Sequence, residues 1–418
     1  MDGDHKLNDV SGKAASRPGQ PRPVGVGRAS PTMPSRFRNF HSLADFEQAA
    51  RRRLPHMLHS FIAGGAEDGV SLANNRAAFA DYAFVPRVLG SISDRMQITN
   101  LFGETYNVPF GIAPMGIGAL FAYRSDILLA RAAEALGLPF VLSASSLIPM
   151  ETVRQAGSTA WYRAYLPGED QRIEALVDRV AAAGFETFVL TVDVPVPANR
   201  ENNERNGFTT PLRPSVKLVW DGLTHPRWLV GTAMKTLLHH GMPHFENTDA
   251  TRGPPILSRD LTRASGLRDQ LGWEHLELIR RRWKGNLVVK GVLAAEDARI
   301  AKEKGADGII VSNHGGRQLD GTIAPLDVLP EVVDAAGDMP VMFDSGVRRG
   351  GDVLKALALG ASFVFLGRSF LYAAVVGGEP AVHHAATLLT KEIDRNMALL
   401  GIRQLSELKP EHVRRIRN

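Results

Sequence analysis

The stretch GIIVSNHGG, residues 308–316, places a short apolar run directly before a polar turn that contains two glycines. Consecutive apolar residues that do not alternate with polar ones are typical of a parallel strand buried on both faces. A buried strand has no need of the histidine that follows. The stretch therefore predicts a parallel strand whose carboxyl end presents chemically active side chains.

Seven further stretches repeat this arrangement, and helix-like sequence such as AAEDARIAKEKGA and GGDVLKALALGA lies between them. Eight strand-and-helix units are the number in a closed barrel, so we predict an α/β fold of the (β/α)8 TIM-barrel type. The predicted strands lie in VPFGIAP (108–114), PFVLSAS (139–145), AWYRAYL (160–166), ETFVLTVD (186–193), NLVVKG (286–291), GIIVSNHGG (308–316), PVMFDSG (340–346) and FVFLGR (363–368).

The segments outside these units suggest how the chain is organised. Residues 1–38 are rich in Gly, Pro, Ser and Arg and predict a disordered arm, and residues 39–418 form the barrel domain. Helical spacing from residue 39 onward, with Ser42 as N-cap, predicts a helical cover before the barrel. Residues 208–285 form an insertion after the fourth strand that is too long for an ordinary connection. Its apolar and basic part, residues 216–245, suits either a lid or a segment that lies on anionic lipid.

Composition excludes several classes of protein. The chain has 44% apolar and 22% charged residues, and no apolar run reaches the length of a membrane span. The absence of cysteine excludes disulfides, thiolate nucleophiles and cysteine-bound metals. No nucleic-acid motif, Rossmann GxGxxG or P-loop is present, so we expect neither nucleic-acid binding nor a classical nucleotide site. The net charge of +5 suits an anionic substrate or a lipid surface. His239, His240 and His244 are interrupted by Gly241 and Pro243, so no metal site is expected.

Polar residues gather at the predicted strand ends. The carboxyl ends of barrel strands meet at one mouth, where catalytic groups of such enzymes lie. The residues at these ends are Ser143, Tyr165, Thr191, Asp193, Lys290, Ser312, His314, Asp344 and Arg368. After the last two strands, Gly346, Arg348, Gly367 and Arg368 supply backbone amides and cations where barrels commonly bind phosphate. The sequence therefore indicates a barrel enzyme with a phosphate-bearing cofactor or substrate.

The motif SNHGGRQLD, together with LPHMLHSFIAGGAED, LTVDVPVPANRE, LVVKG and DSGVRRGGDVLKALALGA, resembles the FMN-dependent L-2-hydroxy-acid oxidases and dehydrogenases. This family includes glycolate oxidase, lactate oxidase and flavocytochrome b2. The resemblance runs from about residue 43 to the C-terminus, and the insertion DGLTHPRW…HHGMPHFEN is most similar to the mandelate dehydrogenase branch. It implies FMN as cofactor, a 2-hydroxy acid as substrate, and a quinone, another carrier or oxygen as electron acceptor.

The resemblance also implies roles for individual residues. His314 would be the catalytic base, with Asp193 holding its imidazolium. Arg317 and Arg200 would clamp the substrate carboxylate, and Tyr165 would bond the substrate. Lys290 would stabilise the negative charge of the reduced flavin. The expected cofactor-binding residues are Pro114, Met115, Gly116, Ser143, Arg163, Thr191, Lys290, Ser312, Asp344, Gly346, Arg348, Gly367 and Arg368.

Three positions depart from the family pattern. Phe61 stands where a substrate-binding tyrosine is usual, and Ser145 stands where an aromatic residue is common, which predicts a bulkier acid than glycolate. Arg163 replaces a glutamine that contacts the flavin. We hypothesise that Arg163 raises the flavin potential or accommodates a second acidic group; the alternative is an arginine turned into solvent or a salt bridge.

Two other functions remain open on the sequence alone. One is another FMN- or phosphate-binding barrel enzyme, such as an isomerase of phosphorylated metabolites. The other is a flavin-binding protein without turnover, which the changes at Phe61 and Arg163 permit. We expect a cytoplasmic protein, with peripheral contact to the inner face of the cell membrane as an option, and a homotetramer.

Overall fold

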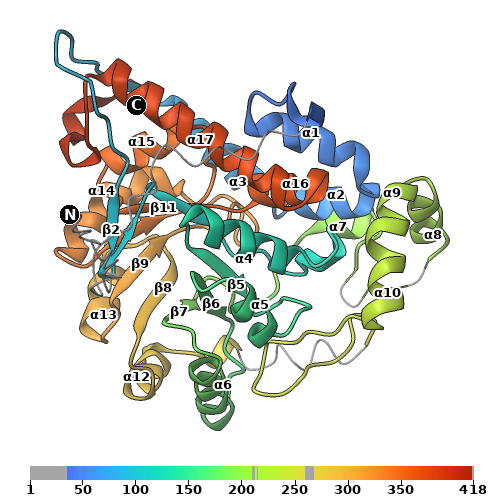
Figure 1. Cartoon of the computed structure of the whole chain (residues 1–418). Helices are drawn as coiled ribbons and strands as arrows, with labels where there is room; N and C mark the ends of the chain where they lie inside the picture. Colours follow the sequence, from blue (N-terminus) through green and yellow to red (C-terminus); the bar gives the residue numbers. More distant parts are fainter. Residues whose placement is uncertain (1–34, 210–211, 214, 259–267, 417–418) are drawn as a thin grey trace, which may run out of the picture. The chain divides into compact units, whose positions relative to one another are not determined.

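Eight parallel strands close into a barrel in a computed structural model that describes residues 35–209, 212–213, 215–258 and 268–416 (Figure 1). The strand order around the barrel is β10-β11-β4-β5-β6-β7-β8-β9. All eight predicted stretches contain one of these strands, which confirms the TIM-barrel prediction. The strands are β4 (Phe110–Ile112), β5 (Phe140–Ser143), β6 (Ala160–Ala164), β7 (Thr187–Thr191), β8 (Asn286–Val292), β9 (Gly308–Val311), β10 (Val341–Phe343) and β11 (Phe363–Leu366).

The barrel is filled with side chains from alternate strand positions. Val141, Trp161, Val189, Val288 and Ile310 are all buried in this inner cluster. A hairpin of β2 (Thr99–Leu101) and β3 (Glu104–Tyr106) packs its aromatic rings onto residues at the amino ends of β6 and β11. The amino end of the barrel is therefore covered, and the carboxyl end remains available for a site.

Helices surround the strands. They are α4 (Ser125–Leu136), α5 (Met150–Ala156), α6 (Asp170–Ala182), α12 (Trp273–Arg282), α13 (Ala295–Glu303), α14 (Pro325–Ala336), α15 (Gly350–Ala358) and α16 (Arg368–Gly377). A long helix, α17 (Glu379–Leu400), packs against α4, α15 and α16. Helix α12 lies inside the range 208–285 that we expected to be inserted, yet it packs against α6 as a barrel helix. The inserted part of that range is correspondingly shorter.

Within the described residues, three α-helices precede the barrel. Helix α1 (Leu43–Arg53) begins after Ser42, whose backbone N–H and hydroxyl both donate to the Asp45 carboxylate. Pro55 then separates α1 from α2 (His56–Ala63), an interruption that the helical spacing did not indicate. Helix α3 (Val70–Ala80) follows, and α1 packs closely on α16. Beyond α3, β1 (Tyr82–Phe84) pairs antiparallel with β12 (Val413–Arg415) at the other end of the chain.

The expected arm, residues 1–38, lies outside the described residues except for its last four positions. Within those four, a 3-10 turn covers Ser35–Phe37, and Phe37 is buried against Phe40 and Phe46. The described structure therefore includes the end of the segment that we expected to be disordered.

The insertion contains α8 (Val216–Leu223), α9 (Pro226–Trp228), a π-helical turn η3 (Leu229–Met234) and α10 (Lys235–His240), after a short helix α7 (Glu201–Arg205). Figure 1 shows α8, α9 and α10 at one side of the barrel, beside α2 and α4. The Asp221 carboxylate accepts hydrogen bonds from the backbone N–H groups of His56 and Met57, and Trp228 Nε1 donates to the Leu120 carbonyl. Among the described helices, none has the length and apolarity needed to cross a membrane.

Candidate active site

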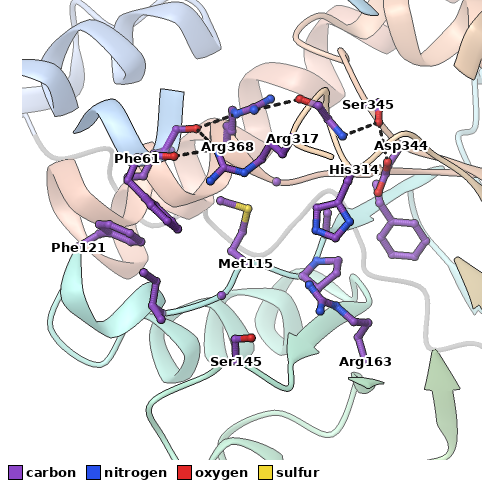
Figure 2. Close-up of a pocket in the computed structure, with 18 of the residues that line it drawn as sticks. Phe61, Met115, Phe121, Ser145, Arg163, His314, Arg317, Asp344, Ser345 and Arg368 are labelled. Carbon is purple, nitrogen blue, oxygen red and sulfur yellow. Dashed lines mark hydrogen bonds between the residues drawn. The ribbon is translucent and has the colours of Figure 1, made fainter. Parts of the chain in front are cut away.

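A cavity of about 280 Å³ opens at the carboxyl ends of the strands (Figure 2). This volume is close to the lower end of the range for small-molecule sites. Most of the predicted site residues line it: Phe61, Pro114, Met115, Gly116, Arg163, Tyr165, Arg200, Lys290, His314, Arg317, Asp344, Gly346, Arg348, Gly367 and Arg368. Ser143, Thr191, Asp193 and Ser312 lie behind this wall and contact it through hydrogen bonds or close packing. Residues from all eight strand ends therefore converge as the sequence predicted.

His314 forms the centre of a hydrogen-bonded group. Its Nδ1 lies 2.9 Å from Asp193 Oδ1, and its Nε2 lies 3.2 Å from the Tyr165 hydroxyl. Because the carboxylate can only accept, Nδ1 carries the proton and the neutral ring keeps its lone pair on Nε2, which faces Tyr165. Burial lowers the pKa of His314 below its usual value, although Asp193 opposes this shift. The geometry suits a base that is neutral before reaction and gains a paired charge during it.

Asp193 is adapted to hold that charge. Burial by itself would raise its pKa, but His314 and Lys290 outweigh burial and lower it. Asp193 Oδ2 is buried without a hydrogen-bond partner among the described residues. The carboxylate is thus charged and oriented toward His314 alone.

The turn that carries His314 is held in a conformation rare for a non-glycine residue. His314 has φ +58°, and Gly315 and Gly316 follow with φ +67° and +72°. A Cβ on Gly316 would lie 2.5 Å from the Leu72 amide nitrogen on α3, so only glycine fits there. The Asn75 and Asn313 side-chain amides exchange two hydrogen bonds of 2.7 Å beneath the turn. The N-terminal cover therefore helps to fix the orientation of the imidazole.

Lys290 lies at the floor of the cavity. It is 3% exposed, its Nζ lies 2.8 Å from Asp344 Oδ2, and it donates to Ser312 Oγ over 2.7 Å. Ser312 Oγ in turn accepts a hydrogen bond from the His314 backbone N–H. Thr191, paired in register with Lys290, has a buried hydroxyl without a partner among the described residues. Thr191 does not line this cavity but a second, smaller one beside Arg268, so its hydroxyl is not assigned to an occupant here.

Two arginines, Arg317 and Arg200, line another part of the cavity wall. Arg317 Nη1 donates to the carbonyls of Phe61 and Gly64 at 2.7 Å, and Arg200 Nε donates to the Arg317 carbonyl. Burial and the neighbouring arginines lower the pKa of Arg317 well below its usual value. These bonds fix the guanidinium of Arg317 at the cavity wall by one nitrogen. Its other nitrogens have no hydrogen-bond partner among the described residues and could bind a carboxylate, the role that the resemblance implies for Arg317 and Arg200.

The phosphate candidates surround one end of the cavity. Gly346 has φ +82°, and a Cβ there would lie 2.1 Å from the Asn75 carbonyl oxygen. Gly367 is the N-cap of α16, and the Arg368 side chain donates to the carbonyls of Ile62, Gly64 and Gly315. Burial and Arg348 lower the pKa of Arg368 to about 10. Free amides at a helix start beside two arginines form a typical anion site.

The charge and the backbone of the residues that line the cavity fit FMN. Arg163, Arg200, Lys290, Arg317, Arg348 and Arg368 line the cavity, whereas Asp344 is the single acidic residue among the described residues of its lining. Such an excess of buried positive charge requires anions for balance, and a cofactor phosphate and a substrate carboxylate supply them. The close backbone approach at Gly346, where a Cβ would meet the Asn75 carbonyl oxygen, is explained by the same occupant. The described residues include no group of three His, Cys, Asp or Glu side chains that could hold a metal ion.

Apolar rings form the remaining wall. Phe61 stacks near Phe121 with ring centroids 5.8 Å apart, and near Phe208 with centroids 4.4 Å apart. Phe245 from the insertion also lines this side, as does Ser145, whose small side chain leaves space. Figure 2 shows Phe61 and Phe121 across Met115 from His314 and Arg163. This chamber suits an apolar group larger than a methyl.

Several residues with a place in the site were missed from the sequence. Arg268, from the far end of the insertion, lies 4.9 Å from the Tyr165 ring centroid. Gln318 accepts from Arg200 and donates to the Asp193 carbonyl, and the Asp320 carboxylate accepts from the first amides of α3. Their polar character was the available signal, but their partners are distant in sequence.

Comparisons with known proteins agree with this geometry. The sequence model of the family described as FMN-dependent dehydrogenase matches residues 50–415. The L-lactate dehydrogenase of Stenotrophomonas maltophilia is 39% identical over 369 residues, which cover 87% of this chain and 96% of that protein. The (S)-mandelate dehydrogenase of Pseudomonas putida is 37% identical, with 90% and 94% covered. A crystal structure of the monotopic membrane protein (S)-mandelate dehydrogenase superposes with a TM-score of 0.83 at 36% identity, covering 90% of this chain and all of that one.

Proposed function

This chain belongs to the family of FMN-dependent dehydrogenases, and we propose that its substrate is an L-2-hydroxy acid with a bulky apolar side chain. It is an FMN-dependent oxidoreductase that converts a 2-hydroxy acid to the 2-oxo acid, like its lactate and mandelate dehydrogenase relatives. The isomerase that the sequence left open has no need of the His314, Arg317 and Arg200 set. The finer assignments below concern which residues act and which acid is used.

The proton of the substrate hydroxyl passes to His314 in this proposal. Nε2 is the free, unprotonated ring nitrogen, and Asp193 lies 2.9 Å from the opposite nitrogen to pair with the imidazolium. Tyr165, 3.2 Å from Nε2, marks where a substrate hydroxyl would be received. FMN, when bound, accepts the two electrons and the other hydrogen that the substrate loses. The ammonium group of Lys290, buried at the floor of the cavity, would stabilise the negative charge that FMN gains with the two electrons.

Arg317 and Arg200 would bind the substrate carboxylate. Both guanidiniums are tied to the wall by backbone carbonyls, which reduces the entropy lost when a carboxylate binds. Phe61, in place of a tyrosine, cannot add a hydrogen bond to that carboxylate. Its ring instead joins Phe121 and Phe208 in the apolar chamber.

The observation that carries the substrate assignment is this aromatic chamber, which lies opposite the catalytic base. It favours an aryl-substituted acid of the mandelate kind over lactate. The test is anaerobic bleaching of the bound flavin by a panel of L-2-hydroxy acids, from lactate to mandelate. We expect mandelate-like acids to bleach the flavin at lower concentrations than lactate does. A yellow protein that lactate reduces more efficiently than any aryl acid would reject the assignment.

We also infer that a quinone-type carrier accepts the electrons at a membrane surface. The insertion presents Val216, Val219, Trp220, Leu223, Val230 and Leu238, all more than half exposed. Lys235 and Arg227 lie among them. An exposed apolar patch with flanking cations is typical of an interfacial segment. The same insertion contributes Phe245 to the cavity wall, so it serves partly as the lid that the sequence allowed.

A flotation assay tests membrane contact. The holoenzyme should float with vesicles of anionic lipid, and a Trp220→Ser, Leu238→Ser double variant should remain at the bottom. Reoxidation of the reduced flavin by a soluble quinone, compared with oxygen, tests the acceptor. Mass photometry of the same preparation measures the oligomeric state, which we predict to be a tetramer.

A further inference from the structure

Arg163 occupies an unusual position for a charged side chain. It lies on β6 between Trp161, which fills the barrel interior, and Tyr165, which lines the mouth. Alternation along the strand places all three on the inner face. Arg163 is level in register with Ser143 on β5 and Val189 on β7, and it is only 2% exposed. Its guanidinium is therefore held at the floor of the cavity rather than turned into solvent.

The guanidinium lacks the acceptors that every other cation of the cavity wall has. Nε and Nη1 of Arg163 are buried with no hydrogen-bond partner among the described residues. The remaining five cavity cations each donate to a named acceptor: Lys290 to Ser312, Arg200 to the Arg317 carbonyl, Arg317 to the Phe61 carbonyl, Arg348 to the Val347 carbonyl and Arg368 to the Ile62 carbonyl. Lys290 is also neutralised by Asp344. Arg163 thus contributes a positive charge that no hydrogen bond or ion pair of the described residues neutralises, and the Asp193 carboxylate acts on it only through space.

The contacts of Arg163 direct that charge toward the reacting side of the cavity. Its Cζ lies 3.9 Å from the centroid of the Tyr165 ring, which itself bonds His314. Figure 2 shows Arg163 beside His314 and across Met115 from Phe61 and Phe121. Arg163 therefore does not face the chamber where the apolar substituent of the substrate would lie.

A buried guanidinium without acceptors destabilises a protein unless a partner enters its site. The substrate carboxylate is already matched by Arg200 and Arg317, and the phosphate by Arg348 and Arg368. The occupant that remains is the polar edge of the flavin ring, which has carbonyl and imine acceptors and gains negative charge on reduction. Lys290 is also assigned to that edge, but its own charge is balanced by Asp344.

We propose that Arg163 binds the polar edge of bound FMN and stabilises the negative charge of its reduced form, which raises its reduction potential. This inference rests on the proposed function. In each turnover the hydroxy acid loses two electrons and two protons, from its Cα–H and O–H bonds, as the C=O bond forms. Two electrons and one proton would pass to bound FMN, the other proton to His314, and an acceptor of the quinone or oxygen class would remove the electrons afterwards. Arg163 is unchanged throughout and acts only by its charge and hydrogen bonds.

The experiment compares FMN-loaded wild type with Arg163→Gln and Arg163→Lys, without any hydroxy acid. Sulfite adds to oxidised flavin through its lone pair and leaves negative charge on the ring, so its dissociation constant reports on anion stabilisation. We expect Arg163→Gln to raise that constant roughly tenfold or more and to lower the midpoint potential by ~30 mV per tenfold loss. Arg163→Lys keeps the charge and should retain most of both values. If Arg163→Gln does not retain FMN, Arg163→Met replaces it as the neutral variant.

One result would overturn the inference: an unchanged sulfite constant and midpoint potential in the neutral variant, whatever its turnover. If that variant also loses affinity for 2-hydroxy acids with a second carboxylate, Arg163 is a substrate ligand instead. If the wild-type protein is yellow and hydroxy acids bleach its flavin, the proposed function stands whatever the result for Arg163. A colourless wild type that binds no added FMN would overturn both proposals together.

Discussion

Replacing Asp193 with asparagine should separate the positioning of His314 from the stabilisation of its charge. The carboxylate and the imidazole are joined by one 2.9 Å hydrogen bond, and both side chains are largely enclosed. Proton transfer to Nε2 creates a positive charge on the ring at a distance of ~4 Å from the carboxylate charge. At an effective dielectric constant of about 20, this pair is worth ~4 kcal/mol. The limiting rate of flavin reduction should therefore fall by about 10³.

The Asp193→Asn variant should also change the pH dependence. Asp193 raises the pKa of His314 against the effect of burial, so its removal should move the ascending limb of the reduction rate to lower pH. Stopped-flow bleaching of the flavin by saturating hydroxy acid, under nitrogen, measures both quantities. The FMN content should stay at that of the wild type, because Asp193 does not line the cavity.

A matched control is Asp394→Asn. Asp394, on α17, pairs with Arg95 and does not line the cavity, so its loss should leave the reduction rate within a few fold of wild type. If Asp193→Asn retained full FMN and reduced it less than tenfold more slowly than wild type, Asp193 could not be the group that stabilises the imidazolium.

Three other predictions test separate parts of the site. Gly346→Ala should lower the free energy of unfolding by about 2–4 kcal/mol, because its Cβ would lie 2.1 Å from the Asn75 carbonyl oxygen; urea unfolding that matches wild type would contradict this. The ratio kcat/KM should rise with pH to a plateau through a midpoint below 6.5, since burial lowers the pKa of His314 and only the neutral ring accepts a proton; a midpoint above 7 would be inconsistent with that environment. Phe61→Ala should raise the KM of an aryl hydroxy acid roughly tenfold more than that of lactate, through loss of about 1.4 kcal/mol of ring packing. Equal effects on the KM of both acids would show that Phe61 does not contact the aryl group.

The barrel and the position of its site could be predicted because the signals are local. Each strand is a continuous apolar run, and the functional residue follows it within a few positions, as His314 follows β9. Since the carboxyl ends of parallel strands meet at one mouth, the order of residues in the chain is enough to gather them. The family resemblance then assigned roles that the spacing could not.

The remaining features depend on contacts between distant parts of the chain. Asp320 caps α3 through the amides of Val70 and Ser71, about 250 positions earlier. Arg268 reaches the Tyr165 ring from the end of an insertion whose local sequence contains no strand signal. That Arg163 lacks an acceptor is likewise a property of packing. A sequence shows that the arginine is present but not whether its N–H groups are satisfied.

The pairing of β1 with β12 has a consequence for the protein's synthesis. Tyr82–Phe84 pairs with Val413–Arg415, and α1 packs on α16, so the earliest elements dock on the latest. At the usual rate of translation, roughly 15 to 65 seconds separate the two strands at the ribosome exit. During that interval α1 has no surface to bury Leu43 and Phe46, and the barrel cannot close. The apolar face of α1 is therefore the part of the described chain that waits longest for its partner during synthesis.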